Sequence, residues 1–468
     1  MSYKYQAQKI NNSQWILEKS VSTPIHIFMN QSLYDHSEEL MWQQAAWATT
    51  IPSVKKVVVT PDGHAGAGVP IGIVVATKDY IAPCAAGYDI SCGMASLRTK
   101  LTSEDIADKK LRRQWINEVE SRVSLGIGKH RVDKQIDINS KLFDEILQHG
   151  ILAFKHIDKN IKDNFEKQYH RVNDFVKYER ATKRGSHQLS SLGGGNHFLE
   201  LQQDDEGNIY IMIHTGSRGY GHQIATDFFN EGLEWWNENH KEQLSKGQKE
   251  KISFPVDSNI GKRYLNAMNQ AANFAIANRY LISKAVIEST EKVFKDSPEL
   301  IYEISHNLVQ FENNLWVHRK GATRALPANN ELLRNTKFEK TGHPILIPGS
   351  MGTSSAILTA KDSEKSLYSV NHGCGRVMGR ADAKRRSIGT DEQKKKILLE
   401  GKHLLPNQEQ LNNEMDEMDI LYNTRNVPID ECLHCYKDID EVLDTVEQAN
   451  LAKIDTRLYP RAVIKGND

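Results

Sequence analysis

The chain has 468 residues, of which 39% are hydrophobic and 8% aromatic, and its 60 Lys and Arg balance its 60 Asp and Glu. This composition is typical of a globular protein with a sizeable core, and a zero net charge excludes binding of nucleic acid by the overall field, so a local basic patch would be needed. We expect no signal peptide, no membrane-spanning segment and no disulfide framework from five cysteines, and hence a cytoplasmic protein without a membrane partner.

The first half of the chain is rich in short β-branched runs. Runs that end in glycine or turn residues predict strands over 54–60 and 70–77, and again over 208–216. Between them, the spacing of apolar residues predicts a helix over 103–123, with Ser103 and Asp105 as cap candidates.

The second half mixes long helical patterns with polar stretches. Residues 261–294 predict a long helix, 314–321 a strand and 436–453 an amphipathic helix. The lysine-rich stretches 242–260 and 328–342 are typical of surface loops. Strands and helices follow one another without a regular βαβ rhythm or an internal repeat, so we predict an α+β protein.

Potential metal ligands stand in four glycine- or turn-rich segments at predicted strand ends. The segments are GYDISCGM (87–94), SLGGGNHFLEL (191–201), IHTGSRGYGHQ (213–223) and SHNLVQFE (305–312). They contain one carboxylate, one thiol and three imidazoles, namely Asp89, Cys92, His197, His214 and His306. Such a mixed donor set suits a borderline divalent transition metal better than magnesium or calcium.

Each of these residues also has an ordinary explanation. A histidine at a strand end is commonly a satisfied polar residue, and a lone cysteine is commonly a small buried hydrophobe. The shared context of the four segments favours a metal site. Five ligands exceed one tetrahedral site, and two adjacent ions bridged by Cys92 would account for them. Thiolate and imidazole ligands alone favour zinc.

Three further segments could contact phosphate. PDGHAGAGVPIG (61–72) places Asp62 and His64 beside a glycine-rich turn, but it lacks the lysine of a Walker A motif, so a turn between strands is the favoured interpretation. ILIPGSMGTSSAIL (345–358) puts hydroxyls at a possible helix start, which would make a phosphate cradle. VHRKGATRALP (317–327) groups three cations in a glycine-flanked turn, where anionic oxygens compete with a solvated surface as the explanation.

The segment SVNHGCGRVMGR (369–380) contains a histidine between glycines. Side chains give His372 little cover, so its ring can be approached closely from outside. Arg376 and Arg380 follow it and could attract an anion.

Together these segments are identified as those of a known family. In order along the chain, PDGHAGAG, GYDISCGM, LGGGNHFLE, HTGSRGYGHQ, HNLVQFE, VHRKGATRA, LIPGSMGTSS, NHGCGR and AVIKG span residues 61–466. The chain thereby resembles the RtcB family of RNA ligases, which join RNA ends using GTP. The resemblance implies one catalytic domain over 1–468, with mixed sheets around a deep central metal-containing cleft and helices outside. The mainly helical segment around 220–300 could form a subdomain.

The resemblance also implies roles for particular residues. Asp89, Cys92, His197, His214 and His306 match the family's ligands of two Mn(II) ions, with Cys92 as the bridge. His372 matches the histidine that becomes guanylylated, and Arg218 and Lys320 match residues needed for activity, by contact with phosphate. The expected GTP contacts are Asn196, Ser350, Ser355, Arg376 and Lys465.

The activity implied is ligation of RNA 3′-phosphate or 2′,3′-cyclic phosphate ends to 5′-hydroxyl ends, in tRNA splicing or RNA repair. A monomer, possible help from an archease-like activator, and basic RNA contacts near 180–184 and 380–386 are also expected. The alternatives are a metal-dependent RNA end phosphodiesterase or cyclic phosphatase, and a non-catalytic RNA-binding module. The first leaves His372 and the GTP cradle without a purpose, and the second leaves the intact set of metal ligands without one.

The chain departs from the family pattern at two sets of cysteines. Cys374 stands where a small apolar residue is usual, and we expect it to be packing. Cys432, His434 and Cys435 could bind a metal of their own, but a short cluster without a distant partner pair favours a structural role.

Overall fold

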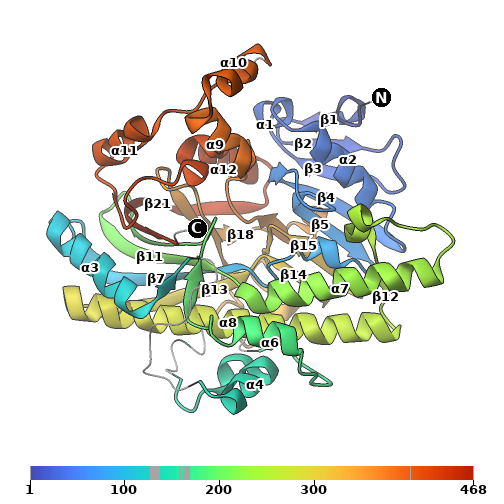
Figure 1. Cartoon of the computed structure of the whole chain (residues 1–468), viewed down its shortest axis with the longest axis horizontal. Helices are drawn as coiled ribbons and strands as arrows, with labels where there is room; N and C mark the ends of the chain where they lie inside the picture. The colour runs from blue at the N-terminus through green and yellow to red at the C-terminus, as the bar shows by residue number, and fades with distance from the viewer. Residues whose placement is uncertain (1, 127–137, 158–160, 162–168, 401, 467–468) are drawn as a thin grey trace.

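A computed structural model describes residues 2–126, 138–157, 161, 169–400 and 402–466 (Figure 1). Within these residues, strands form two large mixed sheets and helices lie outside them, so the α+β class expected from the sequence is confirmed. None of the helices in this part of the chain combines the length and the apolar character needed to cross a membrane.

The first sheet divides two regions of the core. In spatial order its described strands are β1 (Gln8–Asn11), β2 (Gln14–Leu17), β3 (Ile25–Phe28), β4 (Val54–His64), β5 (Ile71–Thr77), β15 (Leu315–Lys320) and β14 (Asn307–Glu312). Successive side chains of a strand point to opposite faces. Val57 and Val59 of β4 therefore join one hydrophobic cluster and Val58 the other. Both faces are buried, which explains the continuous apolar run in this strand.

The second sheet brings the ends of distant strands together. Its described order is β13 (Glu299–Ser305), β7 (Gly93–Thr102), β11 (Asn208–Thr215), β10 (Phe198–Gln203), β21 (Ala452–Lys465), β18 (Ser355–Ala360) and β17 (Pro344–Ile347), with β20 (Leu421–Tyr422) beside β21. In the antiparallel register Gly93 lies opposite both Thr215 and Ser305, while Phe198 lies opposite both His214 and Lys465. The ends of five strands (β7, β10, β11, β13 and β21) therefore lie side by side at one end of this sheet.

The other described strands form three small two-stranded sheets. They join β6 (Tyr80–Ile81) to β12 (Phe254–Pro255), β16 (Ala322–Arg324) to β19 (Ser369–Asn371), and β8 (Ser124–Leu125) to β9 (Ser191–Gly193).

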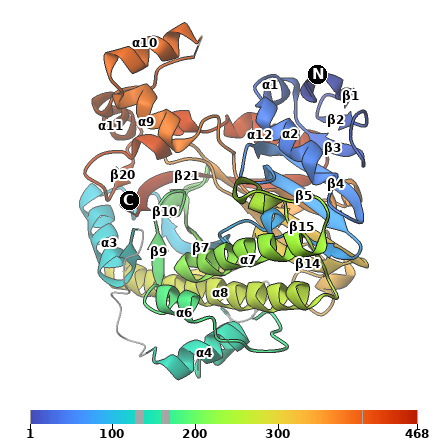
Figure 2. The ribbon, with the colours of Figure 1, turned by 45° about the vertical axis from the view of Figure 1, so that its right-hand side comes forward.

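One long helix packs against the second sheet, and a second long helix lies beside it. α7 (Arg218–Asn239) and α8 (Asn259–Phe294) lie side by side in both views (Figures 1 and 2), and α8 contacts β7 and β11. Small side chains such as Ala271, Ala272 and Ala275 let α8 approach its neighbours closely and bury most of its circumference. Against α8 pack α3 (Lys109–Arg122) and α4 (Ser140–His149), and α6 (Glu179–Gly185) packs against α7.

The remaining helices lie near the first sheet and above the second. They are α1 (Gln31–Asp35), α2 (Glu39–Ala48), α9 (Arg380–Ile388), α10 (Asp391–Leu399), α11 (Gln408–Glu417) and α12 (Ile439–Gln448). In Figure 2, α10 stands out from the body of the protein at the top.

The four predicted strands and the helix over 261–294 are confirmed within a few residues. The helix predicted over 103–123 begins only at Lys109, because the Asp108 carboxylate caps the Lys110 amide at 2.8 Å. Asp105, expected as a cap, instead accepts from the Thr102 amide at 2.8 Å in a turn.

Two other boundaries differ from the prediction. The helix predicted over 436–453 occupies Ile439–Gln448, since Asp438 caps it and residues from Ala452 onward extend as β21. The helix start predicted within 345–358 is wrong: Ser355 begins β18, and the hydroxyls before it form a turn.

Candidate active site

The five candidate metal ligands converge where the strands of the second sheet end. Cys92 directly precedes β7, His214 lies near the end of β11, and His306 directly follows β13. His197 directly precedes β10, which pairs with β11. The register of the sheet therefore places side chains from positions 92 to 306 at one point, although no local motif connects them.

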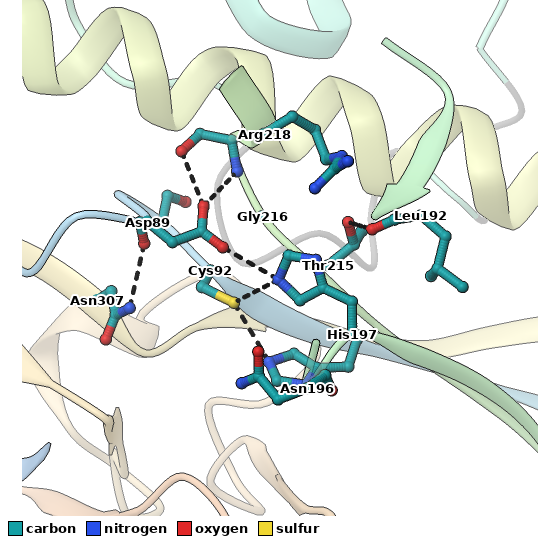
Figure 3. A network of polar contacts seen from close by, with 12 residues as sticks. Asp89, Cys92, Leu192, Asn196, His197, Thr215, Gly216, Arg218 and Asn307 are labelled. Atoms are coloured by element: carbon teal, nitrogen blue, oxygen red, sulfur yellow. Dashed lines mark hydrogen bonds and ion pairs between the residues drawn. The ribbon is translucent and has the colours of Figure 1, made fainter. Parts of the chain in front are cut away.

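The donor atoms lie within hydrogen-bond range of one another. Cys92 Sγ is 3.4 Å from His197 Nε2 and 3.2 Å from His214 Nε2, and His214 Nε2 is 3.3 Å from His306 Nε2. Asp89 Oδ2 is 3.0 Å from His197 Nε2. Figure 3 shows Asp89 and Cys92 pointing toward His197. Among the described residues, Cys92, His197 and His214 form a buried group that could hold a metal ion.

Protonation in this cluster also suits a cation. Burial, together with neighbouring histidines, holds the pKa values of His214 and His306 well below the usual range, so both rings are neutral, as metal ligation requires. His214 Nδ1 lies 3.1 Å from the Asn196 carbonyl oxygen, which leaves Nε2 facing the cluster. Burial and the Asp89 charge raise the pKa of the Cys92 thiol, so ligation would release its proton. These donors fit a borderline divalent transition metal.

Ser217 holds the Asp89 carboxylate through the oxygen that does not contact His197. Asp89 Oδ1 accepts from the Ser217 amide at 3.0 Å and the Ser217 hydroxyl at 3.1 Å. Burial alone would raise the pKa of Asp89, but the hydrogen bond from His197 and the charge of Arg218 outweigh burial and lower it. Gly216 makes this approach possible, because a Cβ there would lie 2.4 Å from the Asp89 carboxylate.

His372 lies next to the metal-ligand candidates. Its ring centroid is 4.8 Å from that of His306, and its Nδ1 is 2.7 Å from Asp62 Oδ2. Burial alone would raise the pKa of Asp62, but the hydrogen bond and charge of His372 outweigh burial and lower it, so the carboxylate only accepts. Nδ1 therefore carries the proton, and in the neutral ring the lone pair is on Nε2. The imidazole, 15% exposed, can act as a nucleophile through that nitrogen.

A cavity of about 290 Å³ opens in front of His372. It extends to His214, so the histidine and the metal-ligand candidates share one space. Its other polar lining includes Asn196, Glu200, Ser350, Arg376, Arg380, Glu431, Tyr436 and Lys465. This volume is at the small end of ligand pockets and suits part of a nucleotide.

One carboxylate organises the cations of the cavity. Glu431 is 3.0 Å from Lys465 Nζ, 3.3 Å from Arg376 and 3.2 Å from Arg380, and it accepts from the Tyr436 hydroxyl at 2.6 Å. Burial would raise the pKa of Glu431, but the charges of these cations outweigh it and lower the pKa to about 2. Three cations held by one anion leave the cavity suited to a phosphate-bearing ligand.

Four of the five residues expected to contact the nucleotide line the cavity, and one does not. Asn196, Ser350, Arg376 and Lys465 line the cavity. Ser355 is buried and does not line it. Its hydroxyl accepts from the Gly349 amide at 3.2 Å and so supports the turn at the cavity wall.

Arg218 and Lys320 both contact the protein backbone. Arg218 is the first residue of α7, and its Nη2 donates to the Gly126 carbonyl at 3.2 Å. Lys320 Nζ donates to the carbonyls of Ala67 at 2.6 Å and Val69 at 3.0 Å, in the loop that follows β4.

Sequence reasoning noticed Asp62 but left it out of the site, and it missed Glu200 and Glu431. The pairing of Asp62 with His372 depends on a contact between distant segments, for which a single sequence has no signal. For Glu200 a signal existed: alternation along β10 puts Glu200 and Gln202 on the face opposite to Leu199 and Leu201, so a pair of polar side chains on one face was predictable. Burial raises the pKa of Glu200 to about 8, an effect that the Gln202 hydrogen bond and the Lys465 charge only partly offset.

The unusual cysteines are not among the metal-ligand candidates, although Cys374 borders the cavity. Cys374 is 2% exposed and belongs to a hydrophobic cluster with Val58 and Val74, as expected for packing. Cys432 Sγ and Cys435 Sγ are 3.7 Å apart, while His434 pairs with Glu414 at 3.0 Å. His434 is therefore occupied by a different partner.

Comparison with known proteins agrees with these features. A family model described as tRNA-splicing ligase RtcB matches residues 44–466. The chain is 33% identical to the tRNA-splicing ligase RtcB of Nanoarchaeum equitans, covering 98% of this chain and 99% of that protein. It is 31% identical to that of Thermococcus kodakarensis, covering 98% of each, and 32% identical to the RNA-splicing ligase RtcB homolog 1 of Entamoeba histolytica, covering 91% and 83%. The family suggested by the motifs is thus confirmed, and this chain belongs to the RtcB family.

Proposed function

We propose that the protein is a GTP-dependent RNA ligase that joins RNA 3′-phosphate or 2′,3′-cyclic phosphate ends to 5′-hydroxyl ends, in tRNA splicing or RNA repair. The observation that carries this proposal is the position of His372, which is held by Asp62, borders the metal-ligand candidates and faces the cavity. The ligase names of its relatives agree with it.

His372 is the proposed nucleophile. Its Nε2 attacks the α-phosphorus of GTP, a P–N bond forms, and the P–O bond to pyrophosphate breaks. Positive charge develops on the imidazole, and the Asp62 carboxylate at Nδ1 stabilises it. A hydrolase would need no such nucleophile, so the paired histidine supports ligation over phosphodiesterase or phosphatase activity.

The remaining steps use the RNA ends. An oxygen of the RNA 3′-phosphate attacks the GMP phosphorus and releases His372, which gives RNA(3′)pp(5′)G. The 5′-hydroxyl then attacks the 3′-phosphorus, the 3′–5′ phosphodiester forms, and GMP leaves. A 2′,3′-cyclic phosphate is first opened by water.

The proposed metal ligands are Asp89, Cys92, His197, His214 and His306, which would hold two Mn(II) ions with Cys92 between them. The position of Cys92 Sγ near two imidazole nitrogens supports its assignment as a ligand. Bound ions supply Lewis-acid stabilisation of phosphate charge. Zinc is expected to bind the same donors and to compete.

The cavity is the proposed GTP site. Asn196, Ser350, Arg376 and Lys465 would contact the nucleotide directly, and Ser355 would act through the turn that it supports. Arg218 and Lys320 are proposed to assist phosphate binding, which requires their backbone contacts to rearrange or the phosphate to bind beside them.

We also propose a monomeric protein with one catalytic domain over 1–468, of which α7 and α8 are part. Both helices contribute to the same hydrophobic cluster as the sheets, which supports one domain over a separate helical subdomain. An archease-like activator could assist the reaction.

The proposal is tested with GTP labelled at the α-phosphate, Mn(II), and RNA bearing a 3′-phosphate and a 5′-hydroxyl. Covalent labelling of the protein and joined RNA are expected. Release of phosphate without joining would indicate a hydrolase, and no reaction would indicate a binding protein. The variant His372→Asn is expected to lose the label, and retention of the label there would refute the nucleophile.

A further inference from the structure

Arg279 is a fully buried arginine in the middle of α8, directed at the ends of the strands that hold the metal-ligand candidates. Its Nη1 donates to the Ser91 carbonyl at 2.7 Å and to the Thr215 carbonyl at 3.1 Å. Its Nη2 donates to the Ser305 hydroxyl at 3.1 Å, and the guanidinium forms an ion pair with buried Glu303.

Each of the three hydrogen-bonded segments contains a candidate ligand one residue away. Ser91 precedes Cys92, Thr215 follows His214, and Ser305 precedes His306. One planar side chain thus connects three segments that are far apart in sequence. We propose that Arg279 is a positioning residue that holds Cys92, His214 and His306 in ligand geometry, so that the cation finds its donors already arranged. This inference rests on the metal site of the proposed function.

The guanidinium is suited to this role by its shape. Its donors lie in one rigid plane, so contacts to several acceptors fix their mutual positions, whereas an ammonium group is a point charge on a flexible stem. Ser91 needs such support, because its φ of 57° is a left-handed conformation that a non-glycine residue adopts at a cost. The carbonyl held by Arg279 belongs to this strained residue.

The preceding residue of α8 provides a second, independent connection. The Asn278 side chain accepts from the Ser191 amide at 3.1 Å and donates to the Ser191 carbonyl at 3.1 Å. It also lies 3.3 Å from both the Thr215 hydroxyl and the Gly216 carbonyl. The strand end at His214 is therefore tied to α8 twice, which indicates that this helix is the frame for the site.

The test uses Co(II) binding to the full chain after removal of metal by a chelator. The readouts are the dissociation constant and the thiolate-to-cobalt absorption band, which reports whether Cys92 ligates, with thermal melting to confirm folding. In Arg279→Lys the buried positive charge and its pairing with Glu303 can persist, while the planar set of guanidinium donors is lost. We expect about 10- to 100-fold weaker Co(II) binding and a diminished band.

Arg112→Lys is the matched control. Arg112 is also buried, and it likewise donates to two carbonyls and a carboxylate, those of Asp419 and Arg461, away from the cluster. This variant is expected to melt at a lower temperature yet to bind Co(II) like the wild type. An equal loss of Co(II) affinity in both variants would overturn the inference, since it would reflect general destabilisation.

Ser305→Ala decides the question if Arg279→Lys does not fold. It removes the contact of the guanidinium with the Ser305 hydroxyl, together with the 2.7 Å hydrogen bond between the Ser305 and Ser91 hydroxyls, with little change in volume. About five-fold weaker Co(II) binding is expected. If folded Arg279→Lys binds Co(II) with the affinity and the thiolate band of the wild type, the role of Arg279 is overturned but the metal site is not. If Arg279→Lys does not fold, the same result in Ser305→Ala has this meaning. A wild-type protein without the thiolate band would overturn the proposed metal site, and the inference with it.

Discussion

His372 and Asp62 form a hydrogen-bonded pair with 2.7 Å between Nδ1 and the carboxylate, although 310 positions separate them in the sequence. The segment that carries Asp62 is itself clamped, because Lys437 Nζ donates to the carbonyls of Pro61 at 3.1 Å and Gly63 at 2.6 Å. Burial lowers the pKa of Lys437 to about 8, and the Asp62 charge partly opposes this shift. Orientation of the imidazole therefore also depends on Lys437, which lies just before α12, far from both residues in the sequence.

Asp62→Asn is expected to slow covalent labelling of His372 by GTP about 10²- to 10⁴-fold, because the amide can favour the wrong tautomer and no longer balances the developing imidazolium. The initial rate of labelling, measured over a range of GTP concentrations, checks this, with the GTP concentration at half-maximal rate little changed. Thr60→Val removes the hydrogen bonds from the Thr60 hydroxyl to the other Asp62 oxygen and to the Gly72 carbonyl, and it is the milder control because the Asp62 carboxylate stays in place. Equal rates for Asp62→Asn and wild type would contradict the role of the pair.

Glu200→Gln is expected to change how stability depends on pH. The folded-state pKa of about 8 lies above the usual carboxyl value near 4.3, so the folded protein holds this proton more tightly than the unfolded chain. The stabilisation from that proton is fully present below the unfolded pKa and is lost as the pH rises through about 8. The variant cannot ionise and should exceed the wild type in stability at pH 9, by an amount on the order of a few kcal/mol.

Denaturant unfolding of both proteins at pH 5, 7 and 9 measures this difference. The gap between variant and wild type should grow steadily with pH. A gap that is constant across this range would mean that Glu200 is already ionised in the folded protein.

Removal of metal is expected to abolish labelling of His372, and Mn(II) is expected to restore it, while Zn(II) competes for the same donors. His306→Asn should not recover with Mn(II) at concentrations that restore the wild type. His343→Asn is the control, since His343 is also fully buried but pairs with Leu326 instead of the cluster. Full labelling of the chelated protein would contradict a metal requirement.

Cys374→Ala is expected to keep wild-type labelling. The side chain packs in the hydrophobic core, and burial raises its thiol pKa to about 12, so it is neither exposed nor nucleophilic at neutral pH. Loss of the sulfur should cost about 1 kcal/mol of stability through the small cavity left. Alkylation of the folded protein followed by mass spectrometry provides the second measurement, and rapid modification of Cys374 would contradict its burial.

Residue type and local context were enough to predict the metal-ligand candidates. Their positions at strand ends followed from β-branched runs that stop at glycine or turn residues, and the sheet register then brought Cys92 and His214 together. The same reasoning failed at Ser350–Ser355, where hydroxyls suggested a helix start. Pairing of β18 with β21 determines that conformation, and pairing partners are not encoded locally.

Interactions between distant segments and the effects of burial account for the rest. A single sequence shows neither that Asp62 meets His372 nor that Arg279 reaches three strand ends. The protonation of Glu200 was equally out of reach, because its pKa depends on the desolvation that only the complete fold imposes.

The position of β21 has a consequence for biosynthesis. This strand follows in sequence every other described strand of its sheet, yet it lies between β10 and β18. A nascent polypeptide still lacking it would expose two open sheet edges, which invite mispairing with other chains. Lys465 is the last residue of the same strand, so the cavity has its full set of cations only after β21 has been synthesised and paired. Completion of the sheet and completion of the nucleotide cavity are therefore the same event.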